Sequence, residues 1–192
     1  SRRVGGRLRY TRRMALSMTG ESGALLSLDD APPVFVVNPA SESPTLLICD
    51  HAGRRIPRRL GDLGVASDAF ERHVAWDIGA LAVARLLSSS LDAALVHSVY
   101  SRLVVDVNRN PGNPSAIAEI SDGCAAAGNC NLSAAARAAR FAELHEPYHA
   151  AIDARLRAIE VTGRIPALVS IHSFTPVFQG FTRPWQIGVL WN

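Results

Sequence analysis

Short apolar runs and longer amphipathic stretches alternate along the chain. Continuous apolar runs over residues 45–49, 93–98 and 167–171 have the length of buried strands and lead into polar loops. Between them, apolar side chains at helical spacing predict helices over 68–88 and 133–160. Apolar strands that alternate with amphipathic helices are typical of an α/β domain with a mostly parallel central sheet.

The pattern predicts two further strands, over residues 102–107 and 186–191, and a Ser- and Pro-bounded linker over 38–44. A length of 192 residues fits one domain. We therefore expect residues 1–44 to form a basic, flexible N-terminal extension and linker. Residues 45–192 are expected to form the α/β domain.

Three polar clusters follow predicted strands, and two of them contain a histidine. They are Asp50-His51, Asp106-Val107-Asn108-Arg109 and His172-Ser173. In parallel sheets, ligands bind beyond the carboxyl ends of the strands, where the loops converge on one crevice. Two buried strands that each deliver a histidine to that edge indicate a functional site more strongly than any isolated histidine does.

The residue types in these clusters suit a metal-dependent hydrolase. Catalytic zinc takes about three protein ligands and keeps one position open for water. His51 and His172 are candidate ligands, and Asp77, near the start of the predicted helix after the first strand, is the preferred third ligand. Asp50 is the competing carboxylate. The alternative is that both histidines are structural and only make hydrogen bonds.

Arg109 belongs to the second polar cluster, and Arg102 precedes this cluster along the chain. A guanidinium group is a planar fork that binds a carboxylate through two hydrogen bonds. We expect Asn108 and Arg109 to bind a substrate carboxylate, and Arg102 to polarise a carbonyl group. The alternative is that Asp106 pairs with one arginine and braces the fold.

A literal H-E-x-x-H motif runs from His145 to His149, but its context argues against a zinc site there. Pro147, inside the motif, removes a backbone hydrogen bond and costs on the order of 3 kcal/mol in a helix interior. We expect the two histidines to lie along one stripe of a helix. The sequence contains no G-x-S-x-G elbow, P-loop or G-x-G-x-x-G pattern.

Composition and charge narrow the possible partners and location. Six of the 20 basic residues, all arginines, lie among the first 20 positions, so the remainder of the chain is net acidic and predicts no nucleic-acid partner. No apolar run approaches the roughly 20 residues that cross a bilayer. Three cysteines without a C-x-x-C pair do not form a disulfide framework, which favours the cytoplasm.

Five blocks of sequence, in order, resemble the N-formylglutamate amidohydrolase family. They are residues 49–57, 73–80, 101–109, 170–176 and 183–192, which include C-D-H-A-G, W-D-I-G-A, S-R-L-V-V-D-V-N-R, S-I-H-S-F-T-P and G-V-L-W-N. The resemblance implies a phosphorylase/hydrolase-like three-layer sandwich related to zinc carboxypeptidases and aspartoacylases. It also implies hydrolysis of a small-molecule substrate, N-formyl-L-glutamate, to L-glutamate and formate, a step in one route of histidine degradation.

The resemblance also implies roles for individual residues. His51, Asp77 and His172 occupy the places of metal ligands, and residues 106–109 look like the Asp-x-Asn-Arg run that binds the substrate carboxylate. Asp50 stands where many family members have Glu. The family continues past residue 192 through a segment with an acidic residue expected to act as general base, so we expect this chain to lack the C-terminal segment of the fold.

The departures from the family pattern leave two alternatives. Glu143 or Glu146 would have to substitute as the base if the chain is active by itself. A rival function is a module that binds acidic amino-acid derivatives without turnover.

Overall fold

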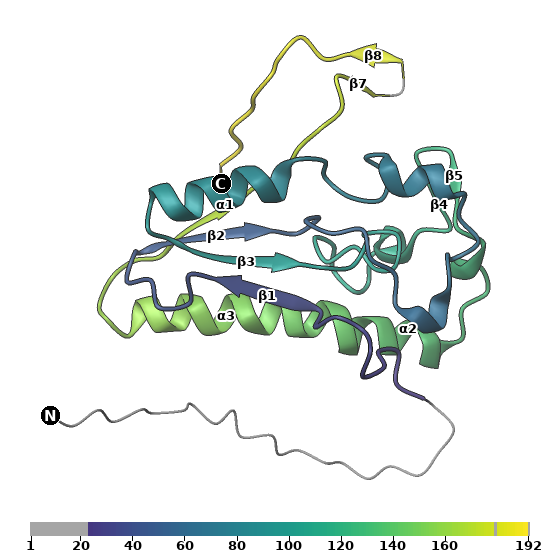
Figure 1. Ribbon diagram of the computed structural model, residues 1–192, viewed down its shortest axis with the longest axis horizontal. Coiled ribbons are helices and arrows are strands. Elements are labelled where there is room, and N and C mark those ends of the chain that lie inside the picture. The colour runs from purple at the N-terminus through teal and green to yellow at the C-terminus, as the bar shows by residue number, and fades with distance from the viewer. Residues whose placement is uncertain (1–22, 179, 192) are drawn as a thin grey trace, which may run out of the picture.

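The structure, a computed structural model, describes residues 23–178 and 180–191. Residues 1–22, which hold the basic N-terminal arginines, lie outside the described residues. Four strands form the central sheet in the order β1-β3-β2-β6 (Figure 1). They are β1 (Val34–Val37), β2 (Thr45–Cys49), β3 (Ala94–Ser98) and β6 (Ala167–Ser170). β2 is parallel to β3 and to β6, whereas β1 is antiparallel to β3.

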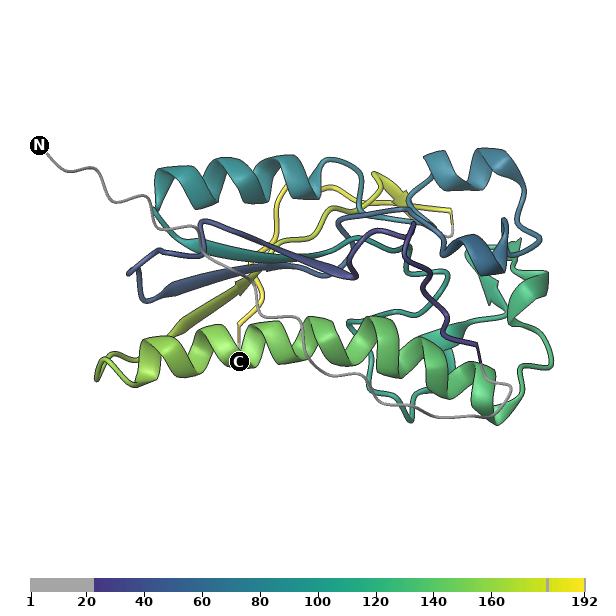
Figure 2. The ribbon, with the colours of Figure 1, turned by 60° about the horizontal axis from the view of Figure 1, so that its bottom comes forward.

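Two helices cover opposite faces of the sheet, α1 (Ala80–Ser90) on one and α3 (Glu146–Glu160) on the other (Figure 2). Leu46 of β2 packs in the cluster that contains α3, and the next residue, Leu47, packs in the cluster that contains α1. Successive side chains of a strand point to opposite faces, so a strand between two helices must be apolar at every position. The mixed α/β fold and its mostly parallel sheet are therefore confirmed.

A second part of the core lies under the loops beyond the carboxyl ends of the parallel strands. Short elements build this region and the arm that follows β6. They are 3-10 turns at Arg58–Leu60, Ser67–Glu71, Pro114–Ile117 and Ala127–Asn129, and the hairpins β4 (Ile120–Ser121) with β5 (Cys124–Ala125) and β7 (Val177–Phe178) with β8 (Phe181–Thr182). Among the residues that the structure describes, no helix has both the length and the apolar character to cross a membrane.

The helix predicted over 133–160 is present as α2 (Ala134–Arg140), a π turn (Phe141–His145) and α3. Ser133 caps its start, because the Ser133 hydroxyl accepts a hydrogen bond from the Ala136 amide. In the π turn, the Glu146 amide donates to the Phe141 carbonyl, five residues back. The wide turn lies directly before Pro147, which has no amide hydrogen to donate, so the helix continues past the proline.

The helix predicted over 68–88 is shorter than expected. α1 begins at Ala80, because Gly79 has a φ of +81° and ends the preceding turn in the left-handed region. Upstream, Ser67–Glu71 forms a 3-10 turn. Asp77 consequently lies in the loop before α1.

The strand predicted over 102–107 is wrong, although residues 103–107 are buried as a strand's would be. Side chains from elsewhere bind its carbonyl groups: Asn129 donates to the Leu103 carbonyl and Arg140 to the Val104 carbonyl. The segment forms turns, because these donors replace the neighbouring strand that a ladder would need.

The strand predicted over 186–191 is also wrong. No strand among the described residues pairs with this segment, and the Leu190 side chain is 99% exposed. The segment belongs to an arm that leaves the sheet after β6 and carries the β7–β8 hairpin (Figure 1). At the other end, β1 lies within residues 1–44, the range expected to be an extension and linker, and forms an edge of the sheet.

Replacing Leu47 by alanine tests how much the sheet depends on the α1 face. Leu47 is 1% exposed, and truncating it leaves a cavity, so we expect the free energy of unfolding to fall by about 2–5 kcal/mol. Leu86→Ala on the outer side of α1, where the side chain is 70% exposed, should change it by less than about 0.5 kcal/mol. Urea denaturation followed by circular dichroism measures both, and equal losses would contradict the packing described.

Candidate active site

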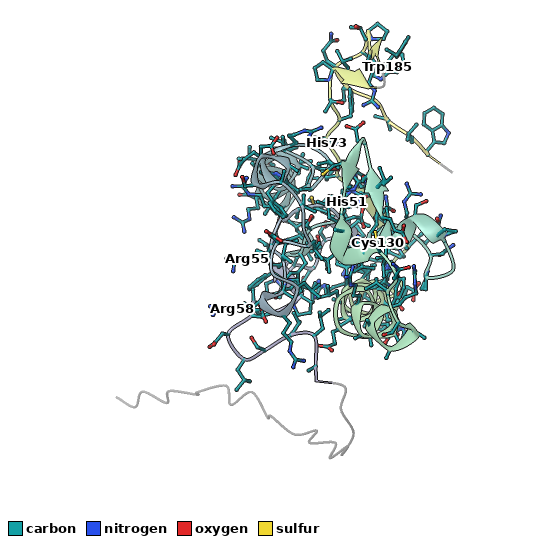
Figure 3. The ribbon with its side chains drawn as sticks, turned by 90° about the vertical axis from the view of Figure 1, so that its right-hand side faces the viewer. His51, Arg55, Arg58, His73, Cys130 and Trp185 are labelled. Atoms are coloured by element: carbon teal, nitrogen blue, oxygen red, sulfur yellow. The ribbon has the colours of Figure 1, made fainter. Side chains whose placement is uncertain are left out.

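Three loops meet beyond the carboxyl edge of the sheet and bring the predicted site residues together. β2 leads directly into Asp50 and His51, and β6 leads into His172. The Asp77 amide donates a hydrogen bond of 2.9 Å to the His51 carbonyl, which ties the loop before α1 to the end of β2. His51 lies inside the molecule beside these loops in Figure 3.

His51, Asp77 and His172, called here the His–Asp–His cluster, form a compact group. One possible ligand atom from each lies within 4.8 Å of the others. The Nδ1 atoms of His51 and His172 lie 3.5 Å and 2.8 Å from the same oxygen, Oδ2 of Asp77. His51 and Asp77 are buried, whereas His172 is partly exposed, so the cluster is open to solvent on one side.

A buried carboxylate lies behind each histidine of the cluster. Nε2 of His51 is 2.8 Å from Oδ1 of Asp106, and Nε2 of His172 is 3.0 Å from Oδ2 of Asp50. A carboxylate on the far nitrogen fixes the tautomer and the ring orientation of a metal-binding histidine. Asp50, the competing carboxylate, therefore lies behind His172, while Asp77 lies between the two Nδ1 atoms.

Two further side chains hold Asp50, and sequence reasoning assigned no role to either. The Tyr148 hydroxyl, on α3, donates to Oδ1 of Asp50 at 2.9 Å, and the Ser170 hydroxyl donates to Oδ2 at 2.7 Å. Ser170 lies in one of the five family-like blocks, which could have singled it out. Tyr148 carries no such signal, because a tyrosine on the buried face of a helix looks like an ordinary core residue.

Arg102 bridges two of the buried carboxylates. Its Nη1 lies 3.3 Å from Asp77 Oδ1 and its Nη2 lies 3.4 Å from Asp106 Oδ2. Nε of Arg109 is also 3.4 Å from Asp106 Oδ2. Asp106 thus pairs with both arginines, so the bracing alternative describes its contacts as well as the functional one does.

The charges at the cluster shift the pKa values of its members. Hydrogen bonds with Asp50 and Asp77 raise the pKa of His172 to about 9. Burial is the largest single effect on Asp106 and alone would raise its pKa, but the hydrogen bond from His51, the charges of His51 and Arg102 and the Asn108 amide together outweigh burial and lower this pKa to about 2. At Asp77 the hydrogen bond from His172 and the nearby imidazole of His51, whose Nδ1 lies 3.5 Å from Oδ2, likewise outweigh burial and hold the pKa well below its ordinary value. The carboxylates are therefore ionised at neutral pH.

Residues 106–109, called here the anion loop after the carboxylate-binding role expected from the sequence, lie next to the cluster. The Asn108 amide donates to Oδ1 of Asp106 at 3.0 Å, and the Arg109 amide donates to the Asp106 carbonyl at 3.1 Å. The loop turns around the Asp106 carboxylate in this way, and the side chains of Asn108 and Arg109 stay exposed. The strand predicted over 102–107, before this loop, is absent. The loop nevertheless lies beside His51, as expected from the sequence.

The family model of N-formylglutamate amidohydrolase matches residues 43–192. The chain belongs to this family. The crystal structure of gene product Atu2144 from Agrobacterium tumefaciens is similar to it, with 42% sequence identity, a TM-score of 0.80 and 83% of this chain covered. This chain spans 63% of the length of that Agrobacterium protein. A comparison with curated proteins gives no significant match.

The H-E-x-x-H motif of this amidohydrolase-family chain does not form a metal site among the described residues, where the His–Asp–His cluster is the group that could hold an ion. His145 and His149 lie along one stripe of the helix, with ring centroids 4.3 Å apart, and each Nε2 binds a backbone carbonyl. Glu143, one alternative for the general base, accepts hydrogen bonds from the Leu25 and Leu26 amides. Both of its carboxylate oxygens are therefore engaged.

The atoms of the His–Asp–His cluster fit a zinc ion. Nδ1 of His51 is buried and has no hydrogen-bond partner. Such an unsatisfied buried atom costs about 1–3 kcal/mol, a cost that a bound metal would remove. Two imidazole nitrogens and one carboxylate are also the ligand types of catalytic zinc sites, which leave a fourth position open.

Gly53, two residues after His51, tests how tightly the site loop is held. A Cβ at this position would overlap the backbone carbonyl of Val99, so Gly53→Ala must displace the loop. We expect a loss of about 1–3 kcal/mol in the free energy of unfolding, measured by urea denaturation. Gly112→Ala is the matched control, because its Cβ would meet nothing within 4 Å. An unchanged stability of Gly53→Ala would contradict the close approach.

Proposed function

We propose that this protein is a zinc-dependent amidohydrolase that converts N-formyl-L-glutamate and water to L-glutamate and formate. One observation carries the proposal: two histidine Nδ1 atoms and the Asp77 carboxylate converge on one point beside a loop with exposed Asn108 and Arg109 side chains. A metal-binding group next to an anion-binding group suits the hydrolysis of an amide whose substrate is acidic. Family membership supports the same reaction class.

The His–Asp–His cluster would hold the zinc ion. Zinc, when bound, acts as a Lewis acid and lowers the pKa of a bound water to about 7. The protein prepares the cluster by placing Asp106 and Asp50 against the Nε2 atoms of the two histidines, at 2.8 Å and 3.0 Å. These carboxylates keep the protons on Nε2, so Nδ1 is the atom that each histidine would offer to the metal. His172, whose pKa is about 9, would release its Nδ1 proton when the metal binds.

Arg102 is the catalytic residue that we assign beside the metal. Its guanidinium is fixed by Asp77 and Asp106 at one rim of the cluster and is only partly exposed. A positioned cation at that place would polarise the substrate carbonyl and stabilise the negative charge that develops on its oxygen as water attacks. Because two carboxylates already orient the guanidinium, little reorganisation is needed during the reaction.

Asn108 and Arg109 would bind the side-chain carboxylate of the substrate. Both side chains are exposed on a loop whose backbone is fixed around Asp106. A guanidinium and an amide can together donate several hydrogen bonds to one carboxylate. This contact would select acidic N-acyl amino acids over neutral ones.

The proposal also covers the domain, the fold class and the cellular location of the reaction. We assign residues 45–192 to the amidohydrolase-like domain, to whose sheet β1 adds an edge strand from the preceding residues. We assign its fold to the phosphorylase/hydrolase-like three-layer class, with helices on both faces of the sheet as supporting evidence. We place the reaction in the cytoplasm, as a step of histidine degradation, with a small molecule as the partner.

Metal content tests the ligand assignment directly. Plasma mass spectrometry of the purified protein should find about one zinc per chain, and His172→Ala should lose it because one of three ligands is gone. His149→Ala is the control and should retain zinc, since Nε2 of His149 binds the Val107 carbonyl instead. Loss of zinc from His149→Ala alone would refute the assignment.

Substrate selectivity tests the proposed reaction and the role of Arg109. The zinc-loaded protein should deplete N-formyl-L-glutamate. Arg109→Ala should raise the KM for this substrate at least about tenfold while changing the KM for N-formyl-L-glutamine, whose side chain is uncharged, less than about twofold.

Two results would contradict the reaction or the role. Equal effects of Arg109→Ala on both substrates would show that Arg109 does not contact the side-chain carboxylate of the substrate. Thermal stabilisation by N-formyl-L-glutamate without depletion would indicate a binding protein.

A further inference from the structure

Two histidines that the proposed reaction does not use bind the backbone of the anion loop. Nε2 of His149 lies 2.8 Å from the Val107 carbonyl, and Nε2 of His145 lies 3.0 Å from the Arg109 carbonyl. A carbonyl only accepts hydrogen bonds, so both imidazoles carry their proton on Nε2. The two histidines thus donate to the carbonyls on either side of Asn108.

These bonds complete the fixation of the loop backbone. Asp106 already accepts the Asn108 amide through its carboxylate and the Arg109 amide through its carbonyl. Together with the two histidine contacts, each peptide unit from Val107 to Arg109 has at least one bonded polar group. The backbone direction that aims the Asn108 and Arg109 side chains is therefore set largely by α3 and the π turn before it.

The imidazole rings are themselves fixed in place. They lie at i and i+4 of the helical stretch, with centroids 4.3 Å apart. The Phe141 ring lies edge-on to His145, and the Tyr148 ring lies edge-on to His149, each with centroids 5.5 Å apart. Burial lowers the pKa of His145, which keeps this imidazole neutral near pH 7.

The same helix turn also reaches the metal end of the site. Tyr148, between the two histidines in sequence, donates to Asp50, which lies behind His172. One rigid turn therefore contacts the support of a metal ligand and the support of the anion loop. This turn and the contact of Asp106 with Nε2 of His51 at 2.8 Å together fix the separation between the His–Asp–His cluster and the side chains of Asn108 and Arg109, a separation that would match the length of the substrate.

We propose that His145 and His149 are positioning residues that fix Asn108 and Arg109 relative to the His–Asp–His cluster and so select the chain length of the acidic substrate. The inference rests on the proposed function. It gives the H-E-x-x-H motif a role in specificity, through backbone carbonyls, instead of a role in metal binding.

Matched amide replacements test this role. The Nε2 group of glutamine can take the place of the imidazole Nε2 donor, whereas asparagine is one methylene shorter and does not reach the carbonyl. For His149→Asn and His145→Asn we expect about a tenfold higher KM for N-formyl-L-glutamate, kcat within about twofold and full zinc content. The preference for N-formyl-L-glutamate over N-formyl-L-aspartate should fall about tenfold. His149→Gln and His145→Gln should restore most of both values.

If His145 and His149 only stabilised the fold, the variants would not change the substrate preference in this way. Asp153→Ala, at an exposed position of α3, is the control and should change no kinetic parameter. The inference is overturned if the asparagine variants leave the glutamate-to-aspartate preference unchanged, if glutamine rescues nothing, or if zinc content and kcat fall while KM stays the same.

A binding measurement separates this inference from the proposed reaction. If the parent protein depletes neither formylated substrate, the reaction fails, and calorimetry with glutarate then tests the positioning role alone. About tenfold weaker glutarate binding by the asparagine variants, with rescue by glutamine, supports the inference. Equal binding by all variants, or no binding by the parent, overturns it.

Discussion

Three carboxylates, those of Asp50, Asp77 and Asp106, lie almost out of contact with solvent, at 4%, 1% and 5% exposure. An ionised carboxylate in a protein interior costs several kcal/mol unless charges and hydrogen bonds compensate it. Two histidines lie between these three groups, so that each imidazole contacts two carboxylates. The loops after β2 and β6, the loop before α1 and the anion loop all depend on this one network.

The network explains why functional and structural roles cannot be separated residue by residue. Arg102 neutralises two carboxylates and is also the cation to which we assign the polarisation of a substrate carbonyl. Asp106 supports His51, pairs with two arginines and binds the Asn108 amide. In such a coupled group the effect of one substitution includes the charges that it leaves uncompensated, so effects measured singly do not add.

Sequence patterns were sufficient to predict those elements whose secondary structure follows from the order of apolar and polar side chains along the chain. Continuous apolar runs identified β2 and β3, which are buried between helices on both faces of the sheet, and also β6, which lies at the sheet edge and is exposed, unlike the buried strand that its apolar run predicted. Residues 102–107 have an equally apolar pattern, but their backbone groups bind Asn129, Arg140 and other distant partners, which no local pattern reveals. His51, Asp77 and His172 could be singled out as residues at loop entrances, whereas Tyr148 could not, because its function depends on a contact 98 positions away.

The parallel pairing of β2 with β6 has a consequence for how the protein reaches its native state. The Ser170 hydroxyl meets the Asp50 carboxylate across 120 positions of sequence, so the chain must close a very long loop before this contact can form. Pairings of this kind form slowly, since the entropy of loop closure is lost before the contacts can compensate it. His172 follows β6 directly, and it joins His51 and Asp77 only after that late step. Newly made chains therefore bring the three residues of the His–Asp–His cluster together at the end of folding, and an assembled cluster is evidence that the sheet has already formed.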